Sequence, residues 1–360
     1  MKFIHIADVH LGASPDFGYP WNKTREKEIW DSLTRLVEQI KREKTELLLV
    51  AGDLFHGQPL MRECRELNYL WEQIPDTAVV LIAGNHDHIR KDSAYLKMNW
   101  ASNVIGLWGE NCQSVYIEKC NAYVYGLSYH RKEMCDPIYN RTFPGKEMNL
   151  RTEHRDAKHI LLAHGGDDKH IPIRFGALSQ ASFDYIGLGH IHQPQIIEKN
   201  KMAYAGSLEP LDRNHIGPRG YIRGEIGELG TKIEFVPFAK REYKILSVNV
   251  DAKDSSFSVQ EKVKSLIKKL GEQHIYRVEL VGHRHPETYF SQEDYTRYGN
   301  VIDVTDRTEP EYDLDKIRRQ YMGTAVAAYI DSFKQGTNEL TEVEEKALYY
   351  GVWSLLKAGE

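Results

Sequence analysis

Five segments of this chain share one pattern, in which an apolar and largely β-branched run ends in a short loop rich in glycine, aspartate, asparagine or histidine. They are KFIHIADVHLG (2–12), ELLLVAGDLFHG (46–57), AVVLIAGNHDH (78–88), HILLAHGG (159–166) and FDYIGLGHIH (183–192). Runs that are apolar at almost every position are typical of strands buried on both faces of a sheet. Amphipathic helical patterns lie between some of these runs, at residues 26–43 and 62–74. The alternation predicts an α/β fold of packed sheets with outer helices.

Length and charge narrow the class of protein. A chain of 360 residues exceeds the usual size of one hydrophobic core, so we expect two or three domains. No apolar run approaches the roughly 18–20 residues of a membrane span, and the first residues do not resemble a signal peptide, so we expect a cytoplasmic protein without a membrane partner. The formal net charge of −5 offers no bulk attraction for nucleic acid. DNA binding would therefore depend on local basic surface or on bound cations.

The pattern of apolar runs that end in polar loops stops near residue 240, where we expect a domain boundary. Residues 1–240 would form the α/β domain, completed by a strand hairpin over 220–238. The next segment predicts a small α+β domain over 241–308, with strands at 241–251, 274–283 and 300–306 and a helix at 259–271. Residues 309–360 predict two helices, at 314–335 and 341–359. Thr341 and Glu344 form a capping-box pattern at the start of the second helix.

Polar side chains follow the predicted strands of the first domain at the point where each strand ends. In an open α/β sheet, the loops beyond the carboxyl ends of the strands build the functional site. We therefore expect these side chains to converge on one place. They are Asp8, His10, Asp53, Asn85, His86, His164, His190 and His192.

These residue types suit a pair of divalent cations. Mixed carboxylate and imidazole ligands fit Mn²⁺, Fe²⁺ or Zn²⁺ better than Ca²⁺ or Mg²⁺, which prefer oxygen alone. In extended backbone, residues two apart point the same way, so D-x-H (8–10) and H-x-H (190–192) could each present a pair of ligands. Asp53 has two oxygens and could bridge two ions, and small glycines beside the ligands would permit tight turns.

The motifs DVH, GD, GNHD, H and GHIH, in this order, resemble the signature of the calcineurin-like metallophosphoesterases over roughly the first 210–240 residues. The resemblance implies a four-layer αββα sandwich and two divalent ions, with Mn²⁺ favoured over Fe²⁺ or Zn²⁺. One ion would be held by Asp8, His10 and His192, and the other by Asn85, His164 and His190, with Asp53 between them.

The resemblance also implies the chemistry. A water activated by the two ions would attack phosphorus in line, and His86 would contact the scissile phosphate or protonate the leaving oxygen. Asp87 would orient His86 through a hydrogen bond. His130 ends a strand-like run and is a weaker alternative to His164. We expect His5 to be packed in the core and the remaining polar groups to be solvated: His88, His154, His159, His170, Asp167 and Asp168.

Two further features resemble the DNA double-strand-break repair nucleases of the SbcD type, in particular their bacterial exonuclease branch. In GDLFH (52–56), His56 follows Asp53 by three residues, a position where the family uses a histidine to place the DNA phosphate. The segment GSLEPLDRN (206–214) with GPRGYIRGEI (217–226) is also similar. The resemblance implies a nuclease, with 3′→5′ exonuclease and single-strand endonuclease activity in DNA repair.

The parts beyond residue 240 fit the same family. The α+β domain resembles its capping domain, and the terminal helices resemble the segment that docks on an SMC-like ATPase of the SbcC type. The expected linker, at about residues 307–313, is shorter than in the family, and the helices could instead pack on their own protein. Related nucleases form homodimers through helices, for which residues 62–74 and 92–102 are candidates here.

Two other functions stay open at this point. A phosphodiesterase or phosphatase for nucleotides or other small phosphoesters would use the same ligands. A catalytically inactive scaffold subunit of an ATPase complex could retain the fold without the chemistry. The full set of seven ligands together with His86 favours an enzyme.

Overall fold

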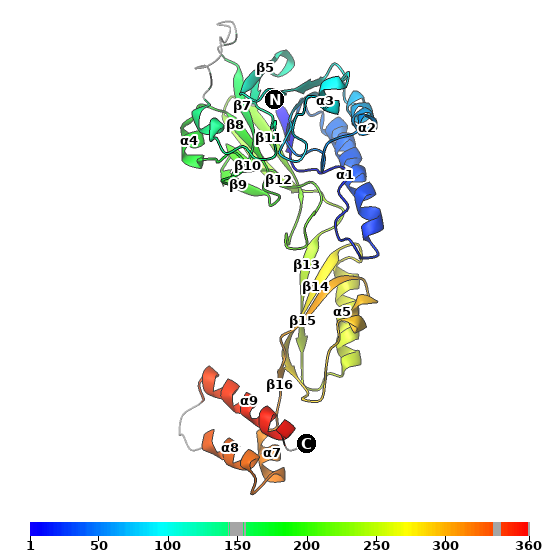
Figure 1. The fold of residues 1–360 in the computed structure, drawn as a ribbon, viewed down its shortest axis with the longest axis vertical. Helices are drawn as coiled ribbons and strands as arrows, with labels where there is room; N and C mark the ends of the chain where they lie inside the picture. The colour runs from blue at the N-terminus through cyan, green and yellow to red at the C-terminus, as the bar shows by residue number, and fades with distance from the viewer. Residues whose placement is uncertain (143, 145–153, 155, 334–339, 359–360) are drawn as a thin grey trace. The chain divides into compact units, whose positions relative to one another are not determined.

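The strands expected from the five apolar runs all form in the computed structural model, which describes residues 1–142, 144, 154, 156–333 and 340–358. Within these residues the chain divides into two units, Met1–Tyr243 and Lys244–Glu360. The first unit contains two sheets (Figure 1). One has the order β12 (Gly230–Pro237), β11 (Gly220–Gly227), β1 (Lys2–Ile6), β2 (Leu47–Ala51), β3 (Ala78–Ile82), β4 (Val104–Gly106). The other has the order β5 (Gln113–Ile117), β6 (Ala122–Gly126), β7 (Lys158–His164), β8 (Tyr185–Gly189), β10 (Met202–Tyr204), β9 (Gln195–Glu198).

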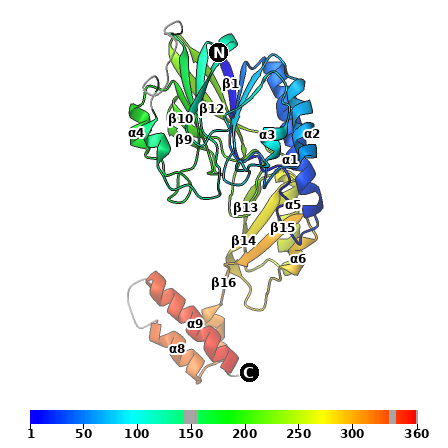
Figure 2. The same ribbon diagram turned by 45° about the horizontal axis from the view of Figure 1, so that its top comes forward.

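The two sheets are packed face to face and are covered by helices on both outer sides (Figure 2). Side chains alternate along each strand, so Phe3 of β1 points into the core between the sheets while Ile4 points toward the helices. The first sheet is covered by α1 (Asn22–Glu43), α2 (Met61–Glu72) and α3 (Ala94–Lys97). The second is covered by the short helices η2 (Ile138–Arg141) and α4 (Phe175–Gln180), and η1 (Glu118–Cys120) connects β5 with β6. The predicted four-layer αββα sandwich is confirmed.

Parallel pairing brings the predicted functional loops to one edge. In the first sheet β1, β2 and β3 are parallel neighbours, and in the second β7 is parallel to β8. Parallel strands end at the same side of a sheet, so the loops after these five strands lie together. The edge formed by these loops carries the candidate site.

The second unit contains a sheet of order β13 (Tyr243–Val250), β14 (Ile275–Arg284), β15 (Asn300–Asp306), to which the short strand β16 (Glu309–Pro310) pairs. Its core lies beneath α5 (Ser256–Leu270) and α6 (Glu293–Thr296), with Val263, Ile267 and Tyr276 fully or almost fully buried. These strands and α5 lie where the sequence predicted strands and a helix.

The helix expected over 314–335 is wrong as a single element. The structure shows α7 (Leu314–Gln320) and α8 (Ala325–Phe333), with the chain turning between them at Gly323, whose φ is +84°; residues 334 and 335 lie outside the described part. The second expected helix forms as α9 (Glu342–Ala358). Its capping box is confirmed, since the Thr341 backbone N–H donates to Glu344 at 2.8 Å.

The apolar faces of these terminal helices are largely used against each other. Val326 and Ile330 of α8 pack with Leu348 and Val352 of α9. Other apolar side chains of α9 remain exposed, namely Val343, Tyr350 and Trp353. Among the residues that the structure describes, no helix combines the length and apolar character needed to cross a membrane.

His5 is packed in the core, as expected, and gives a prediction about pH. It is fully buried, and its Nδ1 lies 2.8 Å from the Tyr185 hydroxyl oxygen. Burial lowers the pKa of His5 from 6.5 to about 3. Between these values the unfolded chain binds the proton and the folded chain does not. The free energy of unfolding therefore falls as the pH is lowered, by at most about 1.4 kcal/mol per pH unit.

The substitution His5→Gln retains a hydrogen-bonding side chain but cannot titrate. We expect urea unfolding of the metal-free protein to show a smaller loss of stability between pH 6.5 and pH 4.5 in this variant than in the wild type. Equal losses in the two proteins would show that His5 does not contribute to the acid sensitivity.

Candidate metal centre

The structure brings all seven predicted metal ligands together, six of them in two groups and Asp53 between the groups. Asp8 and His10 follow β1, Asp53 follows β2, and Asn85 follows β3. His164 is the last residue of β7, and His190 and His192 follow β8. The first group contains Asp8, His10 and His192, and the second contains Asn85, His164 and His190.

The first group is compact, with Asp8 and His10 buried and His192 partly buried. One ligand atom from each of Asp8, His10 and His192 lies within 4.8 Å of the other two. The Nε2 atoms of His10 and His192 are 3.1 Å apart. Both carboxylate oxygens of Asp8 accept a hydrogen bond from the backbone N–H of His190, at 3.0 Å each. This contact links the first group to the loop of the second.

The second group is organised around the Asn85 amide oxygen. Oδ1 of Asn85 lies 3.0 Å from His164 Nε2 and 3.2 Å from His190 Nδ1. The other nitrogen of each ring has a partner outside the group. His164 Nδ1 lies 2.9 Å from the Ala51 carbonyl, and His190 Nε2 lies 2.7 Å from the Asp167 carboxylate. A neutral imidazole carries one proton, so these outer contacts leave the inward nitrogens as lone-pair donors.

Asp53 lies between the two groups. Its Oδ2 is 3.7 Å from His10 Nε2 of the first group and 3.4 Å from His164 Nε2 of the second. Its Oδ1 accepts a hydrogen bond from the His86 backbone N–H at 2.8 Å. The same carboxylate therefore faces both groups and holds the loop that carries Asn85.

The ligands converge through unusual backbone rather than through extended strands. Asp8, His10, Asp53 and His190 have φ values of +50°, +51°, +49° and +94°, in the region that non-glycine residues rarely adopt. Such conformations cost free energy and concentrate at functional sites. The expectation that D-x-H and H-x-H present their ligands from extended backbone is wrong, since both lie in loops after the strand has ended.

Close backbone approach at the site requires glycine, as expected. A Cβ atom at Gly84 would lie 2.2 Å from Asp53 Oδ1, and one at Gly189 would lie 2.0 Å from the Ala51 carbonyl oxygen. Neither position has room for a side chain without moving a ligand loop.

Burial sets the protonation of most ligands. It raises the pKa of Asp8 to about 8, although His164 opposes this shift. It lowers the pKa of His10 well below 6.5, and those of His190 and His192 to about 4. The three histidines are therefore neutral at pH 7, which is the form that binds metals. Asp8 is a buried carboxylate that needs a nearby cation to ionise.

The pair of His164 and Asp53 behaves differently. Burial lowers the pKa of His164, but the adjacent Asp53 carboxylate outweighs it and raises the pKa to about 9. For Asp53, burial is opposed by His164, which holds the pKa below its usual value. In the metal-free protein, a protonated His164 would offset the charge of the Asp53 carboxylate.

These observations fit divalent cations. Buried carboxylates, one amide oxygen and imidazole nitrogens converge on two points, and in the second group outer hydrogen bonds fix which ring nitrogens face inward. The mixed oxygen and nitrogen donors suit first-row transition metals.

His56 and His86 lie beside the first group. Their rings are stacked with centroids 5.4 Å apart, and the His86 and His10 centroids are 4.8 Å apart. His86 Nδ1 lies 3.1 Å from the His56 carbonyl oxygen. The carbonyl contacts Nδ1 and not Nε2. Both rings line a cavity of about 280 Å³, together with His10, His192, His215 and residues 13–15, 211 and 212.

Asp87 does not orient His86, and this expectation is corrected. Its Oδ1 accepts from the Gly84 N–H, and its Oδ2 accepts from the Leu54 and Phe55 N–H groups and from the Tyr95 hydroxyl, at 2.6–3.1 Å. None of these four donors belongs to the His86 ring. Asp87 therefore joins the loop of Asp53 to the loop of Asn85, and the His56 carbonyl is the group that contacts the His86 ring.

The sequence prediction missed three residues near the site. Asp167 and His170, expected in solvent, contact His190: Asp167 accepts from its ring, and the His170 ring centroid is 4.5 Å away. The ring centroids of His215 and His192 are 5.7 Å apart. The buried Nδ1 of His215 has no hydrogen-bond partner within the described residues. The weak signal for Asp167 was its position three residues after His164. His130 lies elsewhere, with Nε2 2.8 Å from the Trp108 carbonyl oxygen.

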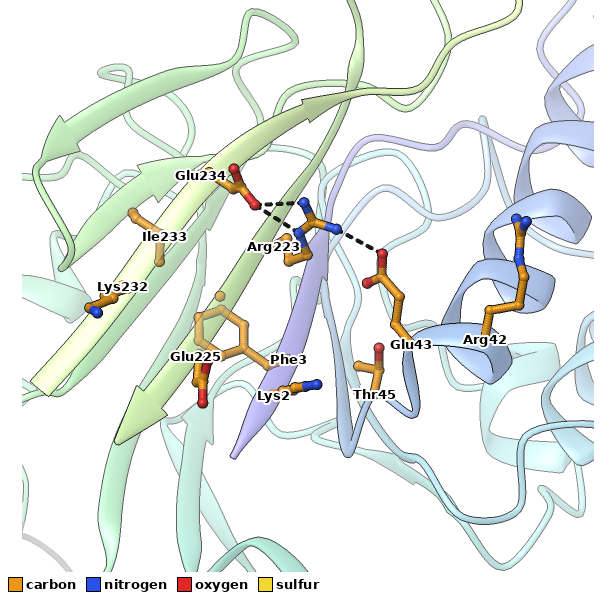
Figure 3. Close-up of a pocket in the computed structure, with 11 residues that line it drawn as sticks. Lys2, Phe3, Arg42, Glu43, Thr45, Arg223, Glu225, Lys232, Ile233 and Glu234 are labelled. Atoms are coloured by element: carbon orange, nitrogen blue, oxygen red, sulfur yellow. Dashed lines mark hydrogen bonds and ion pairs between the residues drawn. The ribbon is translucent and has the colours of Figure 1, made fainter. Parts of the chain in front are cut away.

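A larger cavity, of about 670 Å³, lies at the opposite end of β1 (Figure 3). Arg223 points between Glu43 and Glu234 and forms ion pairs with both, at 2.7 and 2.6 Å. Among the described residues that line it, none is a histidine, an aspartate or a cysteine. None of the predicted site residues lines this cavity, so we do not assign a function to it.

The fold and the site together define an α/β sandwich protein with a centre suited to divalent cations. The family model of the calcineurin-like phosphoesterases matches residues 1–194, more than half of the chain. The chain belongs to this family.

Two curated relatives are DNA double-strand break repair proteins Mre11. The protein from Methanocaldococcus jannaschii is 31% identical over 232 residues, covering 59% of this chain and 58% of that protein. The protein from Archaeoglobus fulgidus is 31% identical over 238 residues, covering 59% and 51%. The chain thus spans just over half the length of these relatives.

Among solved structures, a dimetal phosphatase from Danio rerio is similar at a TM-score of 0.39 and 14% identity, covering 66% of this chain and 99% of that chain. A likeness at this level does not distinguish between substrates.

Proposed function

We propose that this chain is a metal-dependent nuclease that hydrolyses phosphodiester bonds of DNA in DNA repair. The observation that carries the proposal is the placement of His56 and His86 on a cavity lined by His10 and His192 of the first ligand group, which shares Asp53 with the second group. The likeness to two DNA double-strand break repair proteins supports DNA as the substrate.

The chain's own residues suggest a division of tasks. Asp8, His10 and His192 would hold one cation, Asn85, His164 and His190 the other, and Asp53 would contact both. Two bound cations, Mn²⁺ by our proposal, would supply an activated water and neutralise charge on the phosphate. His86 would contact the scissile phosphate or, when both ring nitrogens are protonated, donate its Nε2 proton to the leaving oxygen. The His56 carbonyl accepts from His86 Nδ1 and would orient the ring for either role. His56 would help to position the phosphate.

The resemblance to the DNA repair nucleases supports four more detailed proposals. They are a 3′→5′ exonuclease activity with endonuclease activity on single strands, a homodimer, a cytoplasmic location, and an SMC-like ATPase as partner. The exposed apolar side chains of α9, Val343, Tyr350 and Trp353, support a docking surface in the second unit.

The proposal is tested with end-labelled single- and double-stranded DNA beside a cyclic dinucleotide and p-nitrophenyl phosphate. We expect cleavage of DNA that requires added Mn²⁺ and stops with a chelator. Hydrolysis of the small esters with intact DNA would instead favour a small-molecule phosphoesterase. Absence of Mn²⁺ binding and of all hydrolysis would favour a scaffold subunit.

The variant His56→Ala should separate substrate positioning from metal binding. His56 is exposed, and the backbone carbonyl that contacts His86 is retained in the variant. The variant does remove a ring whose Nδ1 lies 3.3 Å from His10 Nδ1, so the Mn²⁺ stoichiometry is measured together with cleavage. We expect DNA cleavage to fall by about 100-fold while Mn²⁺ stoichiometry is unchanged. His130→Ala, which removes a histidine outside the site, serves as the control and should match the wild type. Unchanged cleavage by His56→Ala would contradict a role in the substrate site.

A further inference from the structure

The loop that follows His164 returns to the second ligand group. Asp167 Oδ2 lies 2.7 Å from His190 Nε2 and 2.9 Å from His170 Nδ1. Its Oδ1 accepts hydrogen bonds from the Lys169 and His170 backbone N–H groups, at 2.8 and 2.9 Å. Two backbone N–H groups and the His170 ring thus hold the carboxylate, and its Oδ2 faces one ring nitrogen of the proposed metal ligand His190.

The loop itself is fixed to the second sheet and to a neighbouring segment. The Gly165 N–H donates to the Gly189 carbonyl at 3.2 Å, next to His190, and the Tyr204 hydroxyl donates to the Gly165 carbonyl at 3.0 Å. Further along, Met134 exchanges two backbone hydrogen bonds with residues 169 and 171. These bonds fix the position of Asp167 relative to His190 independently of the side-chain contact.

The contact determines which nitrogen of His190 is free. An ionised carboxylate only accepts hydrogen bonds, so the proton of a neutral His190 must reside on Nε2. Nδ1 then presents its lone pair toward Asn85 Oδ1, 3.2 Å away, where the second group converges. Partners of this kind orient metal-bound histidines and select their tautomer.

We propose that Asp167, held by His170, is a positioning residue that fixes the tautomer and ring orientation of His190 for the second cation. The inference rests on the proposed two-metal centre. Asp167 would not touch the cation or the substrate, and its effect would be specific to one of the two ligand groups.

The test is Asp167→Asn in the full chain, with two readouts. An asparagine can turn its NH₂ group toward the ring and favour the opposite tautomer, with the proton on Nδ1. In the metal-free protein with ¹⁵N-labelled histidine, NMR should show the Nε2–H tautomer of His190 in the wild type and its loss in the variant. His190→Gln identifies the signal.

The second readout is calorimetric titration with Mn²⁺ alone. We expect two ions per wild-type chain, and in Asp167→Asn one site that is unchanged and one that is weakened by about 10–100-fold. Asp168→Asn removes the same charge from an exposed neighbour and should match the wild type.

The possible failures are distinguishable. If the wild type binds two ions and Asp167→Asn has the same tautomer and both affinities, Asp167 is not a positioning residue and the proposed function is unaffected. If the wild type binds fewer than two ions, the two-metal proposal fails, and this inference fails with it.

Discussion

Replacing His86 with alanine is expected to abolish DNA cleavage while both cations remain bound. The His86 backbone N–H, which donates to Asp53 Oδ1, is retained in the variant. The ring lies on the cavity beside the first group. Loss of a side chain that donates a proton or stabilises charge on the phosphate should lower turnover by about 10³–10⁴-fold.

Turnover on labelled DNA and Mn²⁺ stoichiometry should be measured on the same preparation of His86→Ala. The control is again His130→Ala, which should retain both. Simultaneous loss of a cation and of turnover would show that His86 acts as a ligand or as a support of the metal loops. Retained turnover would remove His86 from the mechanism.

The substitution Asp53→Asn is expected to weaken both cation sites, by at least about 100-fold, and to eliminate cleavage. An asparagine cannot reproduce both contacts of the carboxylate. If its amide oxygen faces His10 and His164, its NH₂ group meets the His86 N–H, and the opposite rotamer directs NH₂ at the ligand groups. Loss of the negative charge also removes the main attraction for a cation shared by the two groups.

Asp53→Asn has a second consequence in the metal-free protein. The pKa of His164 is about 9 because the Asp53 carboxylate outweighs burial. Without that charge, burial dominates, and the pKa of His164 should fall, so that the ring loses its proton at a lower pH. NMR titration measures this shift, and circular dichroism establishes that the variant is folded. A wild-type His164 pKa in the variant, or two intact Mn²⁺ sites, would contradict the bridging position of Asp53.

The sequence was sufficient to predict the strands and the convergence of the polar loops at one edge. Apolar runs such as 47–51 and 78–82 can be recognised because both faces of these strands are buried. Parallel pairing then brings the loops after them to one edge. The assignment of His10 and His192, 182 residues apart, to one group came from the family resemblance, and the structure places their Nε2 atoms 3.1 Å apart. His5 was expected in the core, and the structure places it there.

The local geometry of the ligands was harder to predict from the sequence. Asp8 and His10 approach each other through left-handed backbone conformations, which depend on tertiary contacts that a strand pattern does not encode. Asp87 stands next to His86 in the sequence, but its partners include the Leu54 and Phe55 N–H groups more than 30 residues earlier. Adjacency in sequence was a poor guide to its role.

Residues without a strand pattern were hardest to place. Asp167 lies in a polar loop, and only the folded chain shows that this loop turns back to His190. The break between α7 and α8 follows from Gly323, which a periodic apolar pattern on both sides obscured. For Asp167, tertiary contacts decide the position of a loop that looks solvent-exposed in the sequence. For Gly323, one backbone conformation ends a helix that the surrounding apolar pattern would continue.

The central claim is that two cations lie side by side in contact with Asp53. Titration of the metal-free protein with Mn²⁺, followed by electron paramagnetic resonance, tests it most directly. We predict a spectrum of spin-coupled Mn²⁺ pairs that reaches its maximum at two ions per chain and is lost in Asp53→Asn. A spectrum of isolated ions that saturates at one ion per chain would contradict the claim.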